Sequence, residues 1–143
     1  MIARILPLSL VILLSGCAPE PNPPDVAYRQ FTMSAVVAHL RAIGMLVGGQ
    51  VERTGDLPRH ADALAALANS ASEIFPEGSI GGTTEALPEI WQQPDEFQDA
   101  LDMFQESTAV FAAVASTEQV DDIKAAFDDV RGACRNCHDQ FRE

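Results

Sequence analysis

Positive charge is scarce in this chain of 143 residues, which carries nine Lys and Arg against 21 Asp and Glu and a formal net charge of −12. Between His60 and Ile123 there is no Lys or Arg, whereas 13 acidic residues fall in that stretch. A surface this acidic repels phosphate backbones. The composition therefore argues against a nucleic-acid partner.

Strand patterns and long apolar runs are missing as well. No segment alternates apolar and polar residues as half-buried strands do. The apolar run from Ile5 to Leu14 is about half of the roughly 20 residues that a membrane-spanning helix needs. It follows the positively charged start Met1 to Arg4, and this order is typical of an export signal. We therefore expect residues 1–16 to be a signal peptide.

Cysteine is also rare, and the first of three cysteines ends the export signal in Leu14-Ser15-Gly16-Cys17. This tetrapeptide resembles the lipobox of bacterial lipoproteins, in which the cysteine takes a lipid and becomes the N-terminus. The alternative is ordinary cleavage that leaves Cys17 as a free thiol. Residues 17–24, with four prolines, are expected to form a semi-rigid tether. The expected location is the periplasmic side of a bacterial membrane, with Cys17 as the lipid anchor.

What the chain does contain is helical periodicity, in four segments of residues 25–143. The first begins near Asp25, and the second follows Asp56, which can cap it. The third begins near Pro94, and the fourth at Ser116-Thr117-Glu118-Gln119, which fits a capping box. Residues 75–93 are rich in Gly, Pro and Thr and are expected to form a crossover loop. We predict an all-α domain, an antiparallel four-helix bundle.

Apolar stripes on these segments predict what each helix turns inward. The first helix is expected to present Met33, Val37 and Leu40 on its inner face. Several aromatic residues are expected to form the core and the wall of a cofactor pocket, namely Trp91, Phe97, Phe104, Phe111 and Phe127.

The other two cysteines belong to Cys134-Arg135-Asn136-Cys137-His138. Two thiols at this spacing can reach the two vinyl groups of a haem, and the next imidazole can reach the iron. A zinc site needs about four ligands, and no second Cys/His pair is present to complete one. A thioredoxin-like dithiol follows a strand, and none precedes this motif. We therefore predict one covalent haem c, attached through Cys134 and Cys137 and ligated by His138.

Three stretches carry a resemblance to class II c-type cytochromes, the cytochrome c-prime family. They are Tyr28–Met33, Pro88–Trp91, and the haem motif with the Phe141-Arg142 that follows it. The resemblance covers nearly all of residues 25–143. It implies a four-helix bundle with a haem near its C-terminus, and either electron transfer or gas binding.

The family divides by the residue on the far side of the iron from the histidine, and that position corresponds to Met33. The resemblance implies that a Met there gives six-coordinate, low-spin iron that transfers electrons. An apolar residue there leaves five-coordinate iron that binds nitric oxide and carbon monoxide. Thioether sulfur is an established haem ligand opposite His. The alternative is that Met33 only packs in the core.

Two arginines match family positions near the haem propionates, Arg29 and Arg142. A guanidinium can pair there with a carboxylate, and the alternative for each is a solvated surface charge. His39 and His60 could in principle ligate iron, but His39 lies nearly opposite Met33 on a helix and is expected to be a surface imidazole.

These observations favour a lipid-anchored electron carrier, His138/Met33-ligated, with a redox partner protein of unknown identity. The alternative is a nitric oxide- or carbon monoxide-binding protein with an open distal site. No carboxylate pair or nucleophile triad stands out, so an enzyme is not expected. Residues 131–143 carry three arginines against two acids, a mildly basic end that can orient a partner. Family analogy also implies a possible homodimer through the first two helices.

Overall fold

The structure is a computed structural model that describes residues 22–117 and 119–143. The expected signal peptide, Cys17 and most of the tether lie outside these residues, and so does Glu118 of the expected capping box. The predictions for those positions therefore stay predictions.

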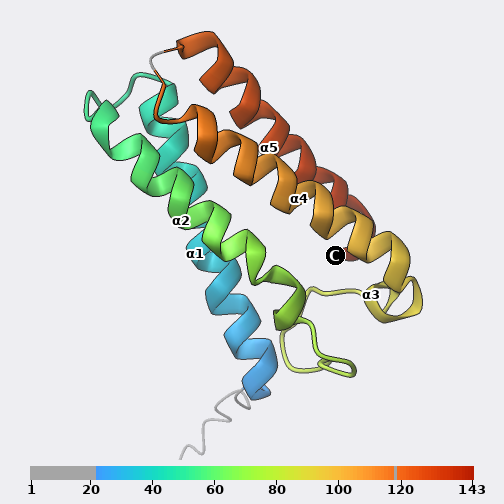
Figure 1. Cartoon of the computed structure of the whole chain (residues 1–143). Helices are drawn as coiled ribbons and strands as arrows, with labels where there is room; N and C mark the ends of the chain where they lie inside the picture. The colour runs from blue at the N-terminus through green and yellow to red at the C-terminus, as the bar shows by residue number, and fades with distance from the viewer. Residues whose placement is uncertain (1–21, 118) are drawn as a thin grey trace, which may run out of the picture.

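The described chain forms an antiparallel bundle of four long helices (Figure 1). These are α1 (Pro24–Val47), α2 (Leu57–Asn69), α4 (Pro94–Val114) and α5 (Val120–Phe141). Three short elements lie in the connections: η1 (Thr54–Asp56), η2 (Ala71–Ile74) and α3 (Glu89–Gln92). The predicted fold class is confirmed.

Proline opens three of the four long helices, because its fixed φ suits the first turn, where a backbone N–H has no partner to lose. The start predicted for α5 was wrong. Its N-cap is Gln119, which makes no side-chain cap hydrogen bond, and Thr117 instead donates to the Val114 carbonyl at 2.8 Å. Asp56 precedes α2 without capping it; its carboxylate pairs with Arg53 at 2.9 Å and with Arg59 at 2.7 Å.

The helices pack most extensively as α4 on α5, then as α2 on α4 and α1 on α2. Within the described ranges, α1 and α5 have almost no direct backbone contact. Three pairs of neighbouring helices are therefore in close contact along their backbones. The fourth pair, α1 and α5, is separated by a cavity.

The inner stripe predicted for α4 is confirmed, since all five of its members are buried: Phe97, Leu101, Phe104, Thr108 and Phe111. Phe111 packs on Phe127 of α5 with ring centroids 5.6 Å apart. The one polar member, Thr108, is satisfied within its own helix, because its hydroxyl donates to the Phe104 carbonyl at 2.9 Å.

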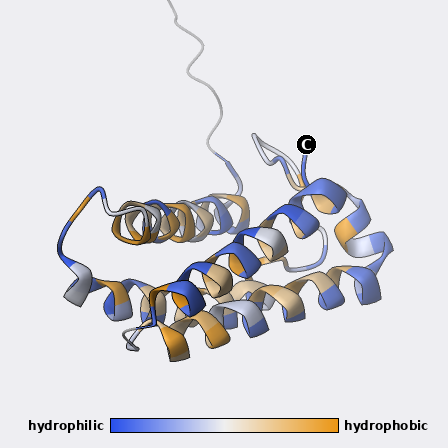
Figure 2. Cartoon of the chain, turned by 90° about the horizontal axis from the view of Figure 1, so that it is seen from above, coloured by the Kyte–Doolittle hydropathy of each residue, from blue (hydrophilic) through white to orange (hydrophobic). Residues whose placement is uncertain are grey.

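The stripe predicted for α1 was partly wrong, because Val37 is 38 % exposed and Val26, Val36 and Ile43 are buried instead. This helix is apolar on most of its turns (Figure 2), so apolar spacing alone does not distinguish its faces. By length and composition it could even cross a membrane. In the bundle Val36, Met33 and Leu40 line the cavity between α1 and α5, whereas Ile43 belongs to the core and does not line it.

Candidate haem site

A cavity of about 740 Å³ lies between α1, α5, the first half of α4 and the crossover loop. Its volume falls within the range of roughly 300–1,000 Å³ that is typical of small-molecule and cofactor sites. Most of its wall is apolar, with contributions from Val36, Leu40, Ile90, Leu101 and Ala133.

One wall is α5, which presents both thiols of the haem motif to the cavity. Cys134 and Cys137 are one helical turn apart and half-buried. Burial raises the pKa of Cys134; burial and the neighbouring Cys134 raise the pKa of Cys137 to about 11. Both groups are therefore thiols at neutral pH. A redox dithiol motif depends on a lowered thiol pKa instead, so this environment suits thioether formation better than disulfide exchange.

His138 lies at the mouth of the same cavity and is exposed. Partial burial against the wall lowers the pKa of its imidazole, and the positive charge of Arg142 lowers it further. Both effects favour the neutral ring. The neutral form is the one that binds iron, so the predicted ligand is in its competent state near pH 7.

Met33 lines the cavity from α1, whereas the haem motif lines it from α5. The side chain is half-buried, and Leu40 lies two turns further along the same face of the helix. The structure thus brings the predicted distal residue and the predicted attachment residues to one cavity. Ligation by Met33 stays a prediction.

Arg29, one turn before Met33, is buried with only 4 % of its surface exposed. Its guanidinium donates to Ser79 Oγ at 2.7 Å, to the Ser79 carbonyl at 2.9 Å and to Thr84 Oγ1 at 2.8 Å. It also lies over the Phe75 ring, 5.1 Å from the centroid. Burial lowers the pKa of Arg29, against the opposing effect of Asp25. Arg29 therefore fastens α1 to the crossover loop, and its predicted propionate contact stays a prediction.

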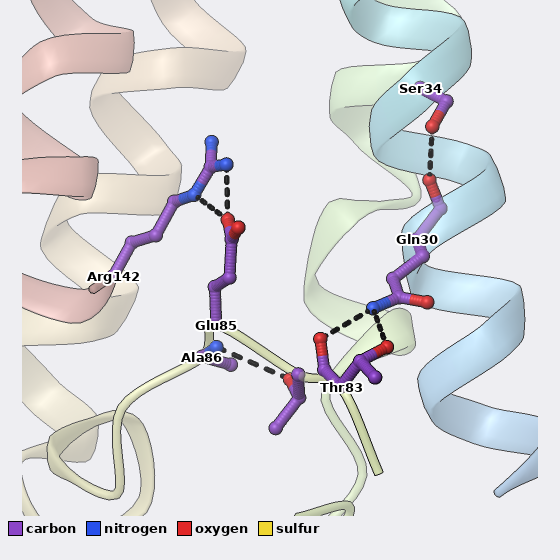
Figure 3. Close-up of polar contacts among 7 residues, drawn as sticks. Gln30, Ser34, Thr83, Glu85, Ala86 and Arg142 are labelled. Atoms are coloured by element: carbon purple, nitrogen blue, oxygen red, sulfur yellow. Dashed lines mark hydrogen bonds and ion pairs between the residues drawn. The ribbon is translucent and has the colours of Figure 1, made fainter. Parts of the chain in front are cut away.

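Arg142, just past the end of α5, forms an ion pair with Glu85 of the crossover loop (Figure 3). The Leu87 backbone N–H donates to the Phe141 carbonyl at 3.0 Å and extends the connection along the backbone. On the opposite side, Gln30 of α1 donates to the Thr83 carbonyl at 2.9 Å, as Figure 3 also shows. The crossover loop thus ties the two walls of the cavity together. Arg142 lines the cavity mouth, and its propionate contact also stays a prediction.

Aromatic side chains form the wall of the cavity near the crossover loop. Phe97 packs edge-on against Phe75 and against Phe141, with centroids 4.9 and 5.1 Å apart. Phe97 and Phe104 line the cavity as predicted. Phe111 and Phe127 are buried in the core, and Trp91 packs against it; none of these three lies in the cavity wall. Trp91 instead donates to the Phe75 carbonyl at 3.2 Å and holds the loop.

Phe141 follows the haem motif by one helical turn and lies on the same stripe of α5 as Cys134 and Cys137, so the helical spacing predicts its inward position. The sequence did not predict Phe75 in this wall. It lies at the start of the crossover loop, and its contact with Arg29 depends on how that loop folds back.

The residues present fit a covalently attached haem. Two neutral thiols and an adjacent imidazole line one wall, most of the remaining wall is apolar or aromatic, and the cavity is large enough for a macrocycle.

The chain matches the family model described as Cytochrome C' over residues 25–142. It belongs to the cytochrome c' family. A cytochrome c' from Pararhodospirillum photometricum is 31 % identical over 119 residues, which are 82 % of this chain and 95 % of that protein.

Solved structures of the family agree with the fold. A cytochrome c prime from Shewanella frigidimarina superimposes with a TM-score of 0.79 at 30 % identity, covering 83 % of this chain and 94 % of that one. A nitric oxide complex of a mutant cytochrome c prime from Alcaligenes xylosoxidans superimposes with a TM-score of 0.76 at 29 % identity. The match covers 83 % of this chain and 94 % of that one. As a cytochrome c', the chain carries covalent haem c and acts as an electron-transfer or gas-binding protein.

Proposed function

We propose that this cytochrome c' is an electron carrier whose low-spin iron is ligated by His138 and Met33, with no catalytic turnover. The observation that carries the proposal is the position of Met33, which lines the haem cavity from α1 while the attachment motif lines it from α5. A thioether opposite a histidine raises the reduction potential of haem iron.

The iron supplies the redox chemistry, and the chain supplies attachment, ligands and exclusion of water. Cys134 and Cys137 hold the macrocycle to α5, and His138 binds the iron from the same helix. Arg29 fixes the turn of α1 that carries Met33, because its side chain is bonded to three groups of the crossover loop. A distal ligand held in this way needs little movement when the iron changes its charge.

A second candidate is gas binding at a distal site that Met33 does not occupy. The nitric oxide complex was obtained with a relative that is 29 % identical to this chain. Supporting it here, Val36 and Val37 extend the apolar cavity wall beside Met33, which gives a small apolar gas a place to sit. The two candidates differ in whether sulfur occupies the sixth position.

The experiment compares the wild type with Met33→Leu and with Met45→Leu as a matched control. Met45 is on α1 too, but it is 45 % exposed and away from the cavity. Leu is close to Met in volume, so neither change should cost more than about 1.5 kcal/mol of stability. We expect only Met33→Leu to turn a low-spin absorption spectrum high-spin and to bind carbon monoxide readily. A wild type that is already high-spin would place gas binding first.

We also propose that the protein is held by lipid on Cys17 at the periplasmic face of a bacterial membrane. The lipobox-like sequence and the proline-rich residues 17–24 support this. We expect mass spectrometry to find a lipid on Cys17 at the mature N-terminus. Cys17→Ser should then release the protein from membranes without changing its absorption spectrum. An unmodified N-terminus elsewhere would contradict the anchor.

A homodimer through the first two helices is a further proposal by family analogy. The exposed apolar residues of α1 support it, since Tyr28, Phe31 and Met45 are 63, 74 and 45 % exposed. Sedimentation equilibrium on a Cys17→Ser protein measures the association without interference from lipid.

A further inference from the structure

A second, smaller cavity of about 270 Å³ opens beside the haem cavity, and three arginines surround it. Arg41 comes from α1, and Arg131 and Arg135 come from α5. All three are exposed. Val37, Leu40 and Phe127 form the apolar part of its wall, and Cys134 completes it.

This cluster is unusual because the chain has so few positive charges. Other arginines are paired or buried: Arg53 and Arg59 with Asp56, Arg142 with Glu85, and Arg29 in the crossover loop.

Within the described ranges, Arg41 and Arg135 form no ion pair. Arg131 pairs only with Asp128, at 3.3 Å, and both of those side chains are exposed. The surroundings of the second cavity therefore carry a local positive charge on a protein whose formal net charge is −12.

The haem itself does not account for this positive charge. Thioether bonds join the cysteines to the vinyl-bearing half of the macrocycle, whereas the propionates project from the opposite half. Arginines that border Cys134 therefore lie toward the vinyl half. Among the described residues only Asp128 pairs with this cluster, so further carboxylates would come from another molecule.

We propose that Arg41, Arg131 and Arg135 form the docking site for the acidic face of a redox partner protein, with Val37 as its apolar centre. Guanidinium groups pair with carboxylates in bidentate fashion, and Val37 is 38 % exposed among them. The rest of the surface repels an acidic partner, so the local charge also selects its orientation.

The position suits electron transfer, because the second cavity shares Val37, Leu40, Arg41 and Cys134 with the haem cavity. A partner seated there would lie beside Cys134, one of the two residues predicted to attach the haem. This inference rests on the electron-transfer function proposed above and names the kind of partner that it serves.

The test uses the reduced holoprotein and ferricyanide, an anion that takes one electron from the ferrous haem and becomes ferrocyanide. If the net charge governs encounter, repulsion makes the rate constant rise with ionic strength. If the arginine site, formed by Arg41, Arg131 and Arg135, governs the encounter, attraction makes the rate constant fall with ionic strength. We expect it to fall for the wild type, and a rise would overturn the proposal.

The triple variant Arg41→Gln, Arg131→Gln, Arg135→Gln should lose about tenfold in rate at low salt, the lower end of steering effects. Its salt dependence should also reverse sign. The matched control, Arg53→Gln, Arg59→Gln, Lys124→Gln, removes the same charge elsewhere and should keep the wild-type sign. Equal behaviour of the two triple variants would overturn the proposal.

A second readout needs no electron transfer. Hexacyanochromate(III) is a redox-inert paramagnetic anion that broadens nearby NMR signals. Each spectrum is compared with that of the same protein without the anion, so that broadening by the iron itself is common to both. The additional broadening should come first at amide signals near Val37 and Arg41 and at those along residues 131–135 that are resolved. A high-spin haem would thus defeat the proposed function but leave this result intact.

Broadening spread evenly, or centred elsewhere, would overturn the docking site. A self-association that the triple variant abolishes would assign the site to a second copy and overturn the redox partner. Sedimentation of both proteins measures this.

Discussion

The two walls of the haem cavity are built in different ways. The α5 wall carries its chemistry in five consecutive residues, Cys134 to His138, so one helix fixes their relative positions. The α1 wall carries Met33, about a hundred residues earlier in the chain, and its position relative to the iron depends on how α1 is held. Attachment is therefore set by the local sequence, whereas the distal ligation that we propose would depend on the whole fold.

Packing follows the same division. The α5 helix is packed along α4 through their most extensive interface, whereas the cavity separates it from α1. What holds α1 at the cavity is the crossover loop, through the buried Arg29 and through Gln30. Substitutions in the α5 wall should thus affect haem attachment, whereas substitutions in the α1 wall should affect stability and the position of Met33.

The largest effect is expected from breaking the α5 wall. In the double variant Cys134→Ser, Cys137→Ser no thiol remains in the haem motif to form a thioether, so covalent haem should be lost entirely. Haem staining after denaturing electrophoresis measures this. The control Cys17→Ser removes the remaining cysteine of the chain and should stain like the wild type. A stained band from the double variant would contradict attachment through this motif.

Breaking the α1 wall should cost stability and loosen the distal site while leaving haem attached. Arg29→Gln removes buried, charge-assisted hydrogen bonds to the crossover loop, and about 2–4 kcal/mol of unfolding free energy should be lost. Urea denaturation measures the change. The control Arg59→Gln, on an exposed ion pair, should change stability by less than about 1 kcal/mol.

The same Arg29 variant should also raise the high-spin fraction of the oxidised protein, since Met33 lies one turn away. Arg29→Lys should not restore the wild-type spectrum, because an ammonium lacks the planar fork that reaches both Ser79 and Thr84. An unchanged spectrum in both variants would mean that the loop does not position the distal wall.

The smallest effect concerns the interface between α1 and α2, where His39, predicted to be a surface imidazole, instead pairs with His60. Their Nδ1 atoms lie 3.0 Å apart, and both rings are half-buried between α1 and α2. One ring must donate and the other accept, which needs at least one neutral ring. Burial lowers the pKa of His39 from its usual 6.5, and the proximity of His60 lowers it further.

The unfolded chain therefore binds this proton more tightly than the folded protein does. The stability from His39 is complete above pH 6.5 and is lost as pH falls through that value toward the lowered pKa. We expect the urea midpoint of the wild type to drop across this interval, and the drop to shrink in His39→Gln. Equal pH profiles for the two proteins would contradict the pairing.

The bundle could be predicted from the sequence because its strongest signal is periodic. The α4 stripe from Phe97 to Phe111 repeats at helical spacing, and the structure buries every member. Helix ends were less certain, since Ser116 and Thr117 offer a cap that the chain does not use. The inner face of α1 could not be predicted from the sequence, because this helix carries apolar side chains on most of its faces.

The site shows the same limit. The attachment residues follow from a five-residue motif, whereas the network of Arg29 with Ser79 and Thr84 joins positions 50 and 55 residues apart. No local pattern signals such contacts. The arginine site likewise combines Arg41 with Arg131, and only the packing of the helices brings them to one cavity.

The most direct test of ligation by Met33 is the proton NMR spectrum of the reduced holoprotein. A methionine methyl held over low-spin ferrous haem lies in the ring current of the macrocycle. Its signal should appear far upfield of all other methyl signals, and it should vanish in Met33→Leu but persist in Met45→Leu. A reduced protein without that signal, with the broad shifted lines of high-spin iron, would contradict the account.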